Sequence, residues 1–481
     1  MSFFSKINTN NKYLYYLSGF IILEFLSWLA YNFSQLNLYI LILTALVTVI
    51  LCFKDSRYYF YIPIAELAWG SLGHGFEYGY FNLRLSIFLA VIFVWFVKNI
   101  NFRNWKILKD GTLLFIFLFL LVFVAAGVLN GYLKSYPIAN IFFDANAYLY
   151  LFYLPVWYQI FESNFVAEFF EIIKAAAIII ALKTVIIFNI FVADYSFLNT
   201  NLIYKWIRDT RTGEITPFGQ GFFRIFFQSQ FYLLLAWFYM FLYQIKDFKN
   251  KTNFLLLSLI SAALLISLSR SFWLGAFVGL VFLLINIFFY QKKHLSVYIF
   301  VWLFVLLISS SLIVLFFYNT PKYHGFNIFY QRTVDSSEAA ASSRSQLLGP
   351  MKKAIGENII IGSGFGRELT YQSSDPRIKN DNNPDGTYTT YAFEWGWLDM
   401  WLKAGLGIIL VFFIWLWQIY QRGYKILNKD PISVLSILSA ITSLIIIHIF
   451  TPYINHPLGL GLLMISIVIF TTYAKEKKSY Y

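Results

Sequence analysis

Glu394 stands in an unusual position for a carboxylate, immediately before a long apolar run. The surrounding stretch, YAFEWGWLDMWLKAGLG, also carries Asp399 and Lys403. These two are four residues apart, so on a helix they form an ordinary ion pair on a face turned away from Glu394. Glu394 has no cation so close in sequence, and aromatic residues flank it. Two interpretations remain open: a helix cap, or a general base whose pKa is raised by aromatic burial.

Arginines are the second group of residues that could bind a ligand or take part in a reaction. A guanidinium stays charged, forks onto phosphate oxygens and loses water more easily than an ammonium. Arg270 is the clearest candidate, because it lies in LISLSRSFWLGAF between two apolar runs with almost no loop. We expect it to bind an anionic ligand, the alternative being that it snorkels to lipid headgroups. For Arg224 and Arg344 a ligand and a solvated surface are both open.

The elements that must position these residues are membrane helices. Hydrophobic residues make up 59% of the chain and charged residues only 13%, which excludes an ordinary soluble domain. Thirteen apolar runs, among them Ala145–Phe161 and Phe223–Ile245, approach the roughly 20 residues that a membrane-spanning helix needs. A shorter run, Tyr59–Gly70, has to cross as well, because the basic segments on either side of it both look cytoplasmic. We therefore predict an all-α polytopic membrane protein with about 12–14 transmembrane helices.

Lysines orient the predicted helices. They fall in alternate short connections, as the positive-inside rule requires of cytoplasmic loops, so both termini are expected in the cytoplasm. The formal net charge of +13 is then mainly topological, and it does not indicate a nucleic-acid partner. Most arginines, in contrast, fall on the outer side. This asymmetry favours an anionic ligand on the outer face.

The predicted topology places one long segment outside. We divide the chain into an N-terminal transmembrane bundle (1–317), a large extracytoplasmic loop (318–393) and C-terminal transmembrane helices (394–481). Within the loop, SSEAAASSRSQLLGPMKKAIGE has helical spacing, and SSDPRIKNDNNPDGTY is rich in turn residues and predicts an exposed flap. A cap of this kind over a helical bundle is a plausible place for chemistry.

Other motifs give weaker evidence for a functional site. The glycines of IIIGSGFGRE lack the Lys-Ser/Thr pair of a phosphate-binding loop, and they favour a tight turn or a close approach of two backbones. The five histidines are scattered, so neither a metal site nor a cofactor is expected. His324 and His456 fall on the outer side and are kept as accessory candidates. The single cysteine, Cys52, excludes an intrachain disulfide.

The order of three motifs resembles a known family. LSRSFWLGAFVGLVF, then a long outer loop holding SRSQLLGPMKKAIGENIIIGSGFG, then EWGWLDMWLKAGLGIILVF, is similar to the O-antigen ligase and O-antigen polymerase superfamily of bacterial envelope glycosyltransferases. The resemblance covers roughly residues 228–413. It implies a GT-C-like fold in the bacterial cytoplasmic membrane and a site on the periplasmic face. There, a glycan is taken from an undecaprenyl-diphosphate carrier without metal or nucleotide sugar.

The resemblance also assigns roles. Arg270 matches the arginine of the Ser-Arg motif, Arg224 that of the earlier outer loop, and Arg344 the one that opens the large-loop helix; all three would bind the diphosphate. Ligases of the family show a His-Asn pair eleven residues before the helix glycine, and counting back from Gly405 reaches Glu394 and a tryptophan. The ligase base is thus absent, and a polymerase with Glu394 as its base is the better match.

The expected reaction transfers a growing glycan to the non-reducing end of a new lipid-linked repeat unit, with inversion at the anomeric carbon. The implied partners are the undecaprenyl-diphosphate-linked oligosaccharide, membrane lipids and a chain-length regulator. Two alternatives stay open. One is a ligase that delivers glycan to lipid A core or to protein, and the other is a flippase for lipid-linked glycan that uses Glu24, Glu66 and Lys183 as a polar path.

Overall fold

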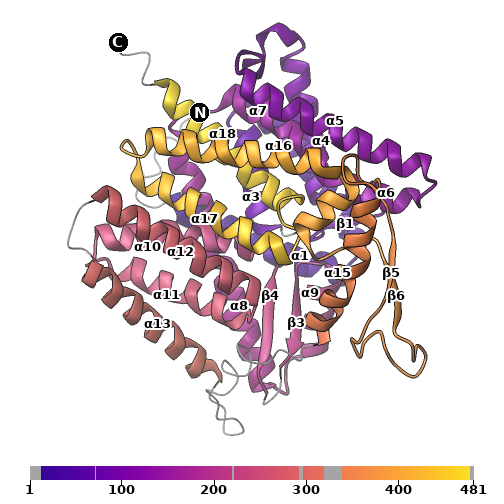
Figure 1. Cartoon of the computed structure of the whole chain (residues 1–481). Helices are drawn as coiled ribbons and strands as arrows, with labels where there is room; N and C mark the ends of the chain where they lie inside the picture. The colour runs from indigo at the N-terminus through magenta and orange to yellow at the C-terminus, as the bar shows by residue number, and fades with distance from the viewer. Residues whose placement is uncertain (1–11, 71, 219–220, 292–295, 319–338, 477–481) are drawn as a thin grey trace.

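The computed structural model describes residues 12–70, 72–218, 221–291, 296–318 and 339–476. Helices dominate it, and three two-stranded antiparallel sheets add short hairpins (Figure 1). The first half holds α1 (Lys12–Asn32), α2 (Gln35–Lys54), α3 (Tyr58–Trp69), α4 (Leu83–Lys98), α5 (Gly111–Leu133), α6 (Ile138–Ala145), α7 (Tyr153–Ile160), α8 (Phe165–Ala193) and α9 (Thr200–Asp209). The second half holds α10 (Gln230–Lys246), α11 (Lys251–Ile266), α12 (Arg270–Gln291), α13 (Ser296–Tyr318), α15 (Ala339–Glu357), α16 (Gly396–Ile426), α17 (Pro431–Phe450) and α18 (Pro457–Glu476).

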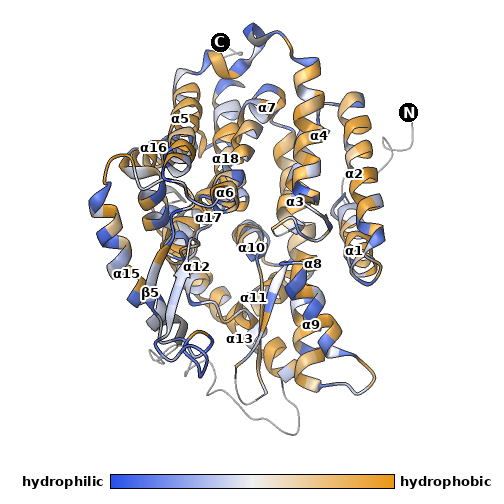
Figure 2. Cartoon of the chain, turned by 90° about the vertical axis from the view of Figure 1, so that its right-hand side faces the viewer, coloured by the Kyte–Doolittle hydropathy of each residue, from blue (hydrophilic) through white to orange (hydrophobic). Residues whose placement is uncertain are grey.

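Within the described residues, nine helices are long and apolar enough to cross a membrane: α1, α2, α5, α8, α12, α13, α16, α17 and α18. Large apolar side chains on α2 and α13 lie exposed, for example Leu43 at 62% and Phe316 at 78%. Such surfaces suit lipid rather than water. Figure 2 shows the helices mainly apolar along their lengths, with hydrophilic residues gathered near their ends and in α9, α15 and the β5 strand. The prediction of a multi-pass membrane protein is confirmed; the count of 12–14 spans stays a prediction.

Two apolar runs have a different structure from the one expected. Ala145–Phe161 is divided into a 3-10 helix, η5 (Asn146–Phe152), and the short α7. Phe223–Ile245 begins as a strand, β4 (Phe223–Phe227), and α10 starts only at Gln230. β4 pairs in antiparallel register with β3 (Gly213–Pro217). Periodicity cannot distinguish a short apolar strand from a buried helix, and the aromatic sequence FRIFF suits either until a pairing partner is known.

Segments that the sequence places on the inner side lie together. Lys98, at the end of α4, donates to the carbonyl oxygens of Cys52 and Phe53 at the end of α2. Arg422, near the end of α16, lies 2.9 Å from Asp110, the residue that caps α5. Within each pair, α2 with α4 and α5 with α16, the predicted inner ends of the two helices therefore lie side by side.

A break in α16 allows the loop after α15 to contact the main chain of this helix. Gly405 has a φ of 82° and a non-helical ψ, so the helix bends there. The loop after α15 enters the break: Ser363 N–H donates to the Leu402 carbonyl at 2.6 Å, and Gly364 N–H donates to the Lys403 carbonyl at 3.0 Å. Gly364 has a φ of 95°, which favours glycine. The expected close approach of two backbones at the GSGFG segment is confirmed.

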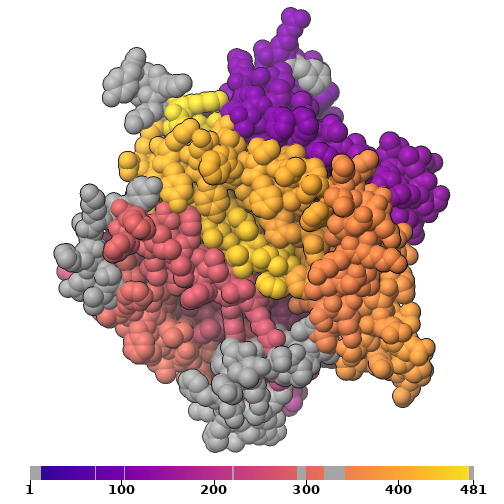
Figure 3. All heavy atoms as spheres, in the orientation of Figure 1, coloured from indigo at the N-terminus to yellow at the C-terminus, as the bar shows by residue number. Residues whose placement is uncertain are grey.

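The elements outside the nine apolar helices include α9, the β3–β4 hairpin, α15 and the hairpin of β5 (Leu369–Gln372) and β6 (Thr387–Thr390). In Figure 1 the β3–β4 hairpin extends toward the lower centre of the molecule and the β5–β6 hairpin lies at its right, and in Figure 3 the orange surface of α15 lies directly against the lighter orange of α16. The predicted helix in the large loop is confirmed as α15. The turn-rich segment joins β5 to β6 and is mostly exposed, although Ser373 and Asp375 are buried.

Candidate functional site

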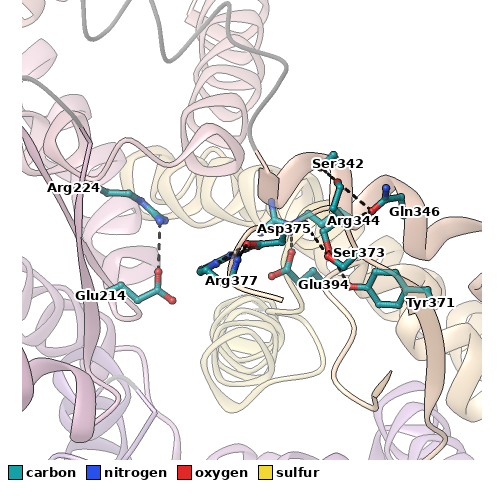
Figure 4. A network of polar contacts seen from close by, with 12 residues as sticks. Glu214, Arg224, Ser342, Arg344, Gln346, Tyr371, Ser373, Asp375, Arg377 and Glu394 are labelled. Atoms are coloured by element: carbon teal, nitrogen blue, oxygen red, sulfur yellow. Dashed lines mark hydrogen bonds and ion pairs between the residues drawn. The ribbon is translucent and has the colours of Figure 1, made fainter. Parts of the chain in front are cut away.

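Arg344 and Glu394 form an ion pair. Arg344 lies on α15, and Glu394 lies two residues before the start of α16, so the pair joins two elements that are fifty residues apart in the sequence. The Trp395 indole N–H donates to the Arg344 backbone carbonyl at 3.0 Å, which fixes the same approach through the main chain. Figure 4 shows the two side chains meeting beside Asp375 and Arg377 of the flap. A predicted base and a predicted phosphate ligand are therefore in direct contact.

This contact changes the interpretation of Glu394. Its side chain is 53% exposed, so the expected enclosure among aromatic residues is wrong. The statement that it has no near cation holds only along the sequence, because Arg344 arrives from another element. Capping is not seen either: in the described structure Trp395 is the N-cap of α16, with no side-chain cap bond. An adjacent guanidinium favours the ionised carboxylate, which is the form that can accept a proton.

Arg224 and Arg270 are both placed at the junction of α11 and α12. Arg224 lies on β4, and its Nε donates to the Ser267 carbonyl at 2.9 Å. Ser267 ends α11, and Arg270 begins α12 three residues later. The turn between the two helices is tight, since Leu268 has a φ of 44°. Arg224 also lies 3.5 Å from Glu214 on β3. Two of the three predicted phosphate ligands are thus held at one helix junction.

The α17–α18 loop connects the two groups of residues. Phe226, on β4, packs against Phe272, and Phe272 packs against Tyr453 of the loop with ring centroids 5.6 Å apart. Two residues after Tyr453, Asn455 donates to Asp399 of α16 at 2.9 Å. A continuous set of contacts thus runs from the Arg224 strand to the helix that follows Glu394. Burial raises the pKa of the Tyr453 phenol, which therefore stays protonated.

The two histidine candidates have different outcomes. His324 lies outside the described residues. His456 lies in the α17–α18 loop, where the Leu458 N–H approaches its Nδ1 at 3.5 Å. Burial, together with the nearby charges of Arg84 and His74, lowers the pKa of His456 to about 3. Its imidazole is consequently neutral and a weak base.

Sequence reasoning missed the buried carboxylate of Asp144, and it did not foresee Arg84 as the partner of Glu66. Asp144, on α6, lies 2.7 Å from Lys403, which also contacts Asp399 at 2.7 Å. Glu66, on α3, lies 2.8 Å from Arg84, and both side chains are almost completely buried. The predicted pairing of Asp399 with Lys403 is confirmed. The signal for the others was weak: each is a charge within or beside an apolar run, whose partner comes from a distant segment.

Of the aromatic residues near Glu394, two are already engaged. The Trp397 ring stacks on Phe413 at 5.3 Å and lies edge-on to His448. Trp395 donates to Arg344 as described. Tyr388, on β6, is 39% exposed and packs edge-on against Tyr371 of β5. An exposed aromatic face of this kind is suited to stacking on a sugar ring.

No group of three metal-ligating side chains that could hold an ion occurs within the described ranges. The chain matches no family model, and no curated protein or solved structure is detectably similar to it. The argument for function therefore depends on the residues themselves.

Proposed function

We propose that this protein is a glycan polymerase of the bacterial cytoplasmic membrane. It transfers a growing chain from undecaprenyl diphosphate to the non-reducing-end hydroxyl of a lipid-linked repeat unit. The observation that carries the proposal is the contact between Arg344 and Glu394 at the outer mouth of α16. The contact brings together a carboxylate and a guanidinium, and the reaction needs one group of each kind: a base for the acceptor hydroxyl and a cation for the departing diphosphate.

The chemistry follows from the leaving group. A lipid diphosphate departs readily once its developing charge is neutralised, and arginines do this with charge-assisted hydrogen bonds. In the proposed reaction, the bond from the anomeric carbon to the diphosphate oxygen breaks, and a bond to the acceptor oxygen forms on the opposite face. The hydroxyl proton passes to Glu394, and undecaprenyl diphosphate leaves with the bonding electrons. The anomeric configuration is inverted.

Each arginine has a distinct place in this proposal. Arg224 and Arg270 are held at the α11–α12 junction, next to a lipid-facing helix, and this suits the diphosphate of a carrier whose tail lies in the bilayer. Arg344 lies on α15 and contacts the base, so it bridges the diphosphate and Glu394. The periplasmic location and the cytoplasmic termini belong to the same proposal.

The experiment that tests the proposal is the length distribution of the surface glycan. A host strain lacking this gene is complemented with wild type, Glu394→Gln or Arg270→Ala at matched protein levels. Two controls alter exposed outer residues of the same types: Glu368→Gln, which removes a carboxylate bonded to Asn140, and Arg208→Ala, which removes a partner of Asp209. We expect single repeat units with both site variants and a full ladder with both controls.

Other outcomes would select an alternative. Loss of surface glycan while long lipid-linked chains accumulate identifies a ligase. Movement of the lipid-linked glycan across vesicles with no change in its length identifies a flippase. In the structure, the charges proposed for that path form closed pairs, since Lys183 lies 2.7 Å from Glu24 and Arg84 lies 2.8 Å from Glu66. An unchanged ladder with Glu394→Gln would rule out Glu394 as the base.

A further inference from the structure

A buried charge cluster lies below the Arg344–Glu394 pair. Lys403 Nζ lies 2.7 Å from Asp144 and 2.7 Å from Asp399, and the three side chains are no more than 9% exposed. The remaining oxygens are also used, because Gly366 N–H donates to Asp144 at 2.7 Å and Asn455 donates to Asp399 at 2.9 Å. The cluster therefore joins α6, α16, the GSGFG loop and the α17–α18 loop at one point.

Stability alone is a weak reason for such a cluster. Removing ions from water is costly, and a buried ion pair often adds little stability relative to apolar residues of similar size. Its partners must nevertheless meet in a single register, so a buried pair can fix the geometry of the segments that carry it. The question is which segments this cluster fixes.

The loop that follows α15 connects the helix that carries Arg344 to the charge cluster. It enters the break in α16, where Ser363 and Gly364 bond the carbonyls of Leu402 and Lys403. Gly366 then bonds Asp144. Lys403 is thus held at its carbonyl by the loop and at its ammonium by Asp144. The helix that carries Arg344 is anchored to the membrane helices through this loop.

The segment that carries Glu394 is anchored at the same place. Lys403 Nζ lies 5.1 Å from the centroid of the Phe393 ring, and Phe393 is the residue before Glu394. Phe393 belongs to a separate apolar cluster with Leu347 and Met351 of α15 and Leu402 of α16. The helix that carries Arg344 and the segment that carries Glu394 therefore pack against the same apolar cluster. Lys403 connects this cluster to Asp144 on α6.

We propose that Lys403 and Asp144 are positioning residues for the Arg344–Glu394 pair, an inference that rests on the proposed function. They hold α15 and the start of α16 in the relative placement that brings the base to the acceptor hydroxyl. Because effective catalysis requires the reacting atoms at contact distance, a shift of about 1 Å is enough to lower the rate by about a hundredfold.

The first test measures geometry without activity. The single cysteine, Cys52, is buried, so Cys52→Ala provides a background for introduced thiols. Arg344→Cys and Glu394→Cys are joined by a short bis-methanethiosulfonate cross-linker in purified protein, with and without Asp144→Asn. Asp110→Asn is the matched control, because Asp110 also belongs to an ion pair, the partly buried one with Arg422, at the other end of α16. We expect cross-linking to fall with Asp144→Asn and to remain with Asp110→Asn.

The second test measures chain extension of a lipid-linked repeat unit in detergent, with native Arg344 and Glu394. We expect Asp144→Asn to lower kcat by at least about tenfold while KM changes by less than about threefold, because the strand that carries Arg224 reaches the cluster indirectly, through Phe272, Tyr453 and Asn455. Asp110→Asn should leave kcat unchanged at a comparable melting temperature. Wild-type cross-linking and kcat in Asp144→Asn, or equal losses in Asp110→Asn, would overturn the inference. If wild type extends no chain, the proposed function fails, and the cross-linking test still decides the positioning role.

Discussion

Arg344 on α15 and Glu394 before α16 form an ion pair across fifty residues of sequence. The two side chains are 39% and 53% exposed, so solvent screens their attraction. An exposed pair of this kind contributes at most about 1 kcal/mol to folding. In the proposed function, the Arg344–Glu394 pair contributes to the reaction rather than to the stability of the fold.

A charge exchange separates these two roles. In Arg344→Glu/Glu394→Arg the pair can form again with its partners reversed, but the carboxylate moves to the other element. We expect a melting temperature close to that of wild type and a loss of chain extension of about a hundredfold or more, as for removal of a general base. The measurement is extension of a lipid-linked repeat unit by purified protein. Activity restored by the exchange, relative to either single variant, would mean that the pair is only structural.

The junction between β4 and α11 gives a second prediction. Arg224→Lys keeps the charge but loses the planar fork, so it cannot both donate to the Ser267 carbonyl and grip a diphosphate in bidentate fashion. We expect undecaprenyl diphosphate to bind about tenfold more weakly, measured by calorimetric titration in detergent. Arg208→Lys, on the exposed end of α9, is the control and should bind as wild type does. Equal affinity in both variants would remove Arg224 from the site.

The break in α16 gives a third prediction. A Cβ at Gly405 would lie 2.0 Å from the Ile360 carbonyl oxygen, and the φ of 82° is strained for any other residue. Gly405→Ala should therefore destabilise the protein by about 3 kcal/mol or more. Gly356→Ala, in exposed space on α15, should instead stabilise it by about 0.5–1 kcal/mol. Thermal unfolding in detergent compares them, and equal melting temperatures would show that the loop does not depend on the break.

The environment of His456 gives a prediction about pH. Burial, then Arg84 and His74, lower the folded-state pKa of His456 to about 3 from its ordinary value of 6.5. Between these values the unfolded chain binds a proton that the folded chain does not, so the free energy of unfolding decreases as the pH falls from about 6.5 toward 3. His456→Gln removes this contribution. We expect its melting temperature to fall less than that of wild type between pH 7 and pH 5; parallel curves would place a charged imidazole in the folded state.

Much of the architecture follows from the sequence alone. Apolar runs of membrane length require helices, because an unpaired backbone in lipid is costly, and nine such helices are found in the described residues. Helical spacing in the large loop predicted α15, and the pairing of Asp399 with Lys403 followed from their four-residue separation. The glycines of GSGFG likewise predicted a close backbone approach. Helical spacing and the four-residue pairing are local, so neighbouring residues determine them, whereas the glycines allowed a close approach without indicating that α16 would make it.

The tertiary structure alone decided which distant charges meet. Nothing in the sequence distinguishes Arg344 from other outer arginines as the partner of Glu394, or assigns Asp144 to a lysine 259 residues away. It also turned part of an apolar run into β4, because β3 offered a pairing edge. Ion pairs and strand pairs depend on distances in space, which composition and periodicity do not contain. The helices were therefore set by the sequence, and the candidate site by how those helices and their loops pack.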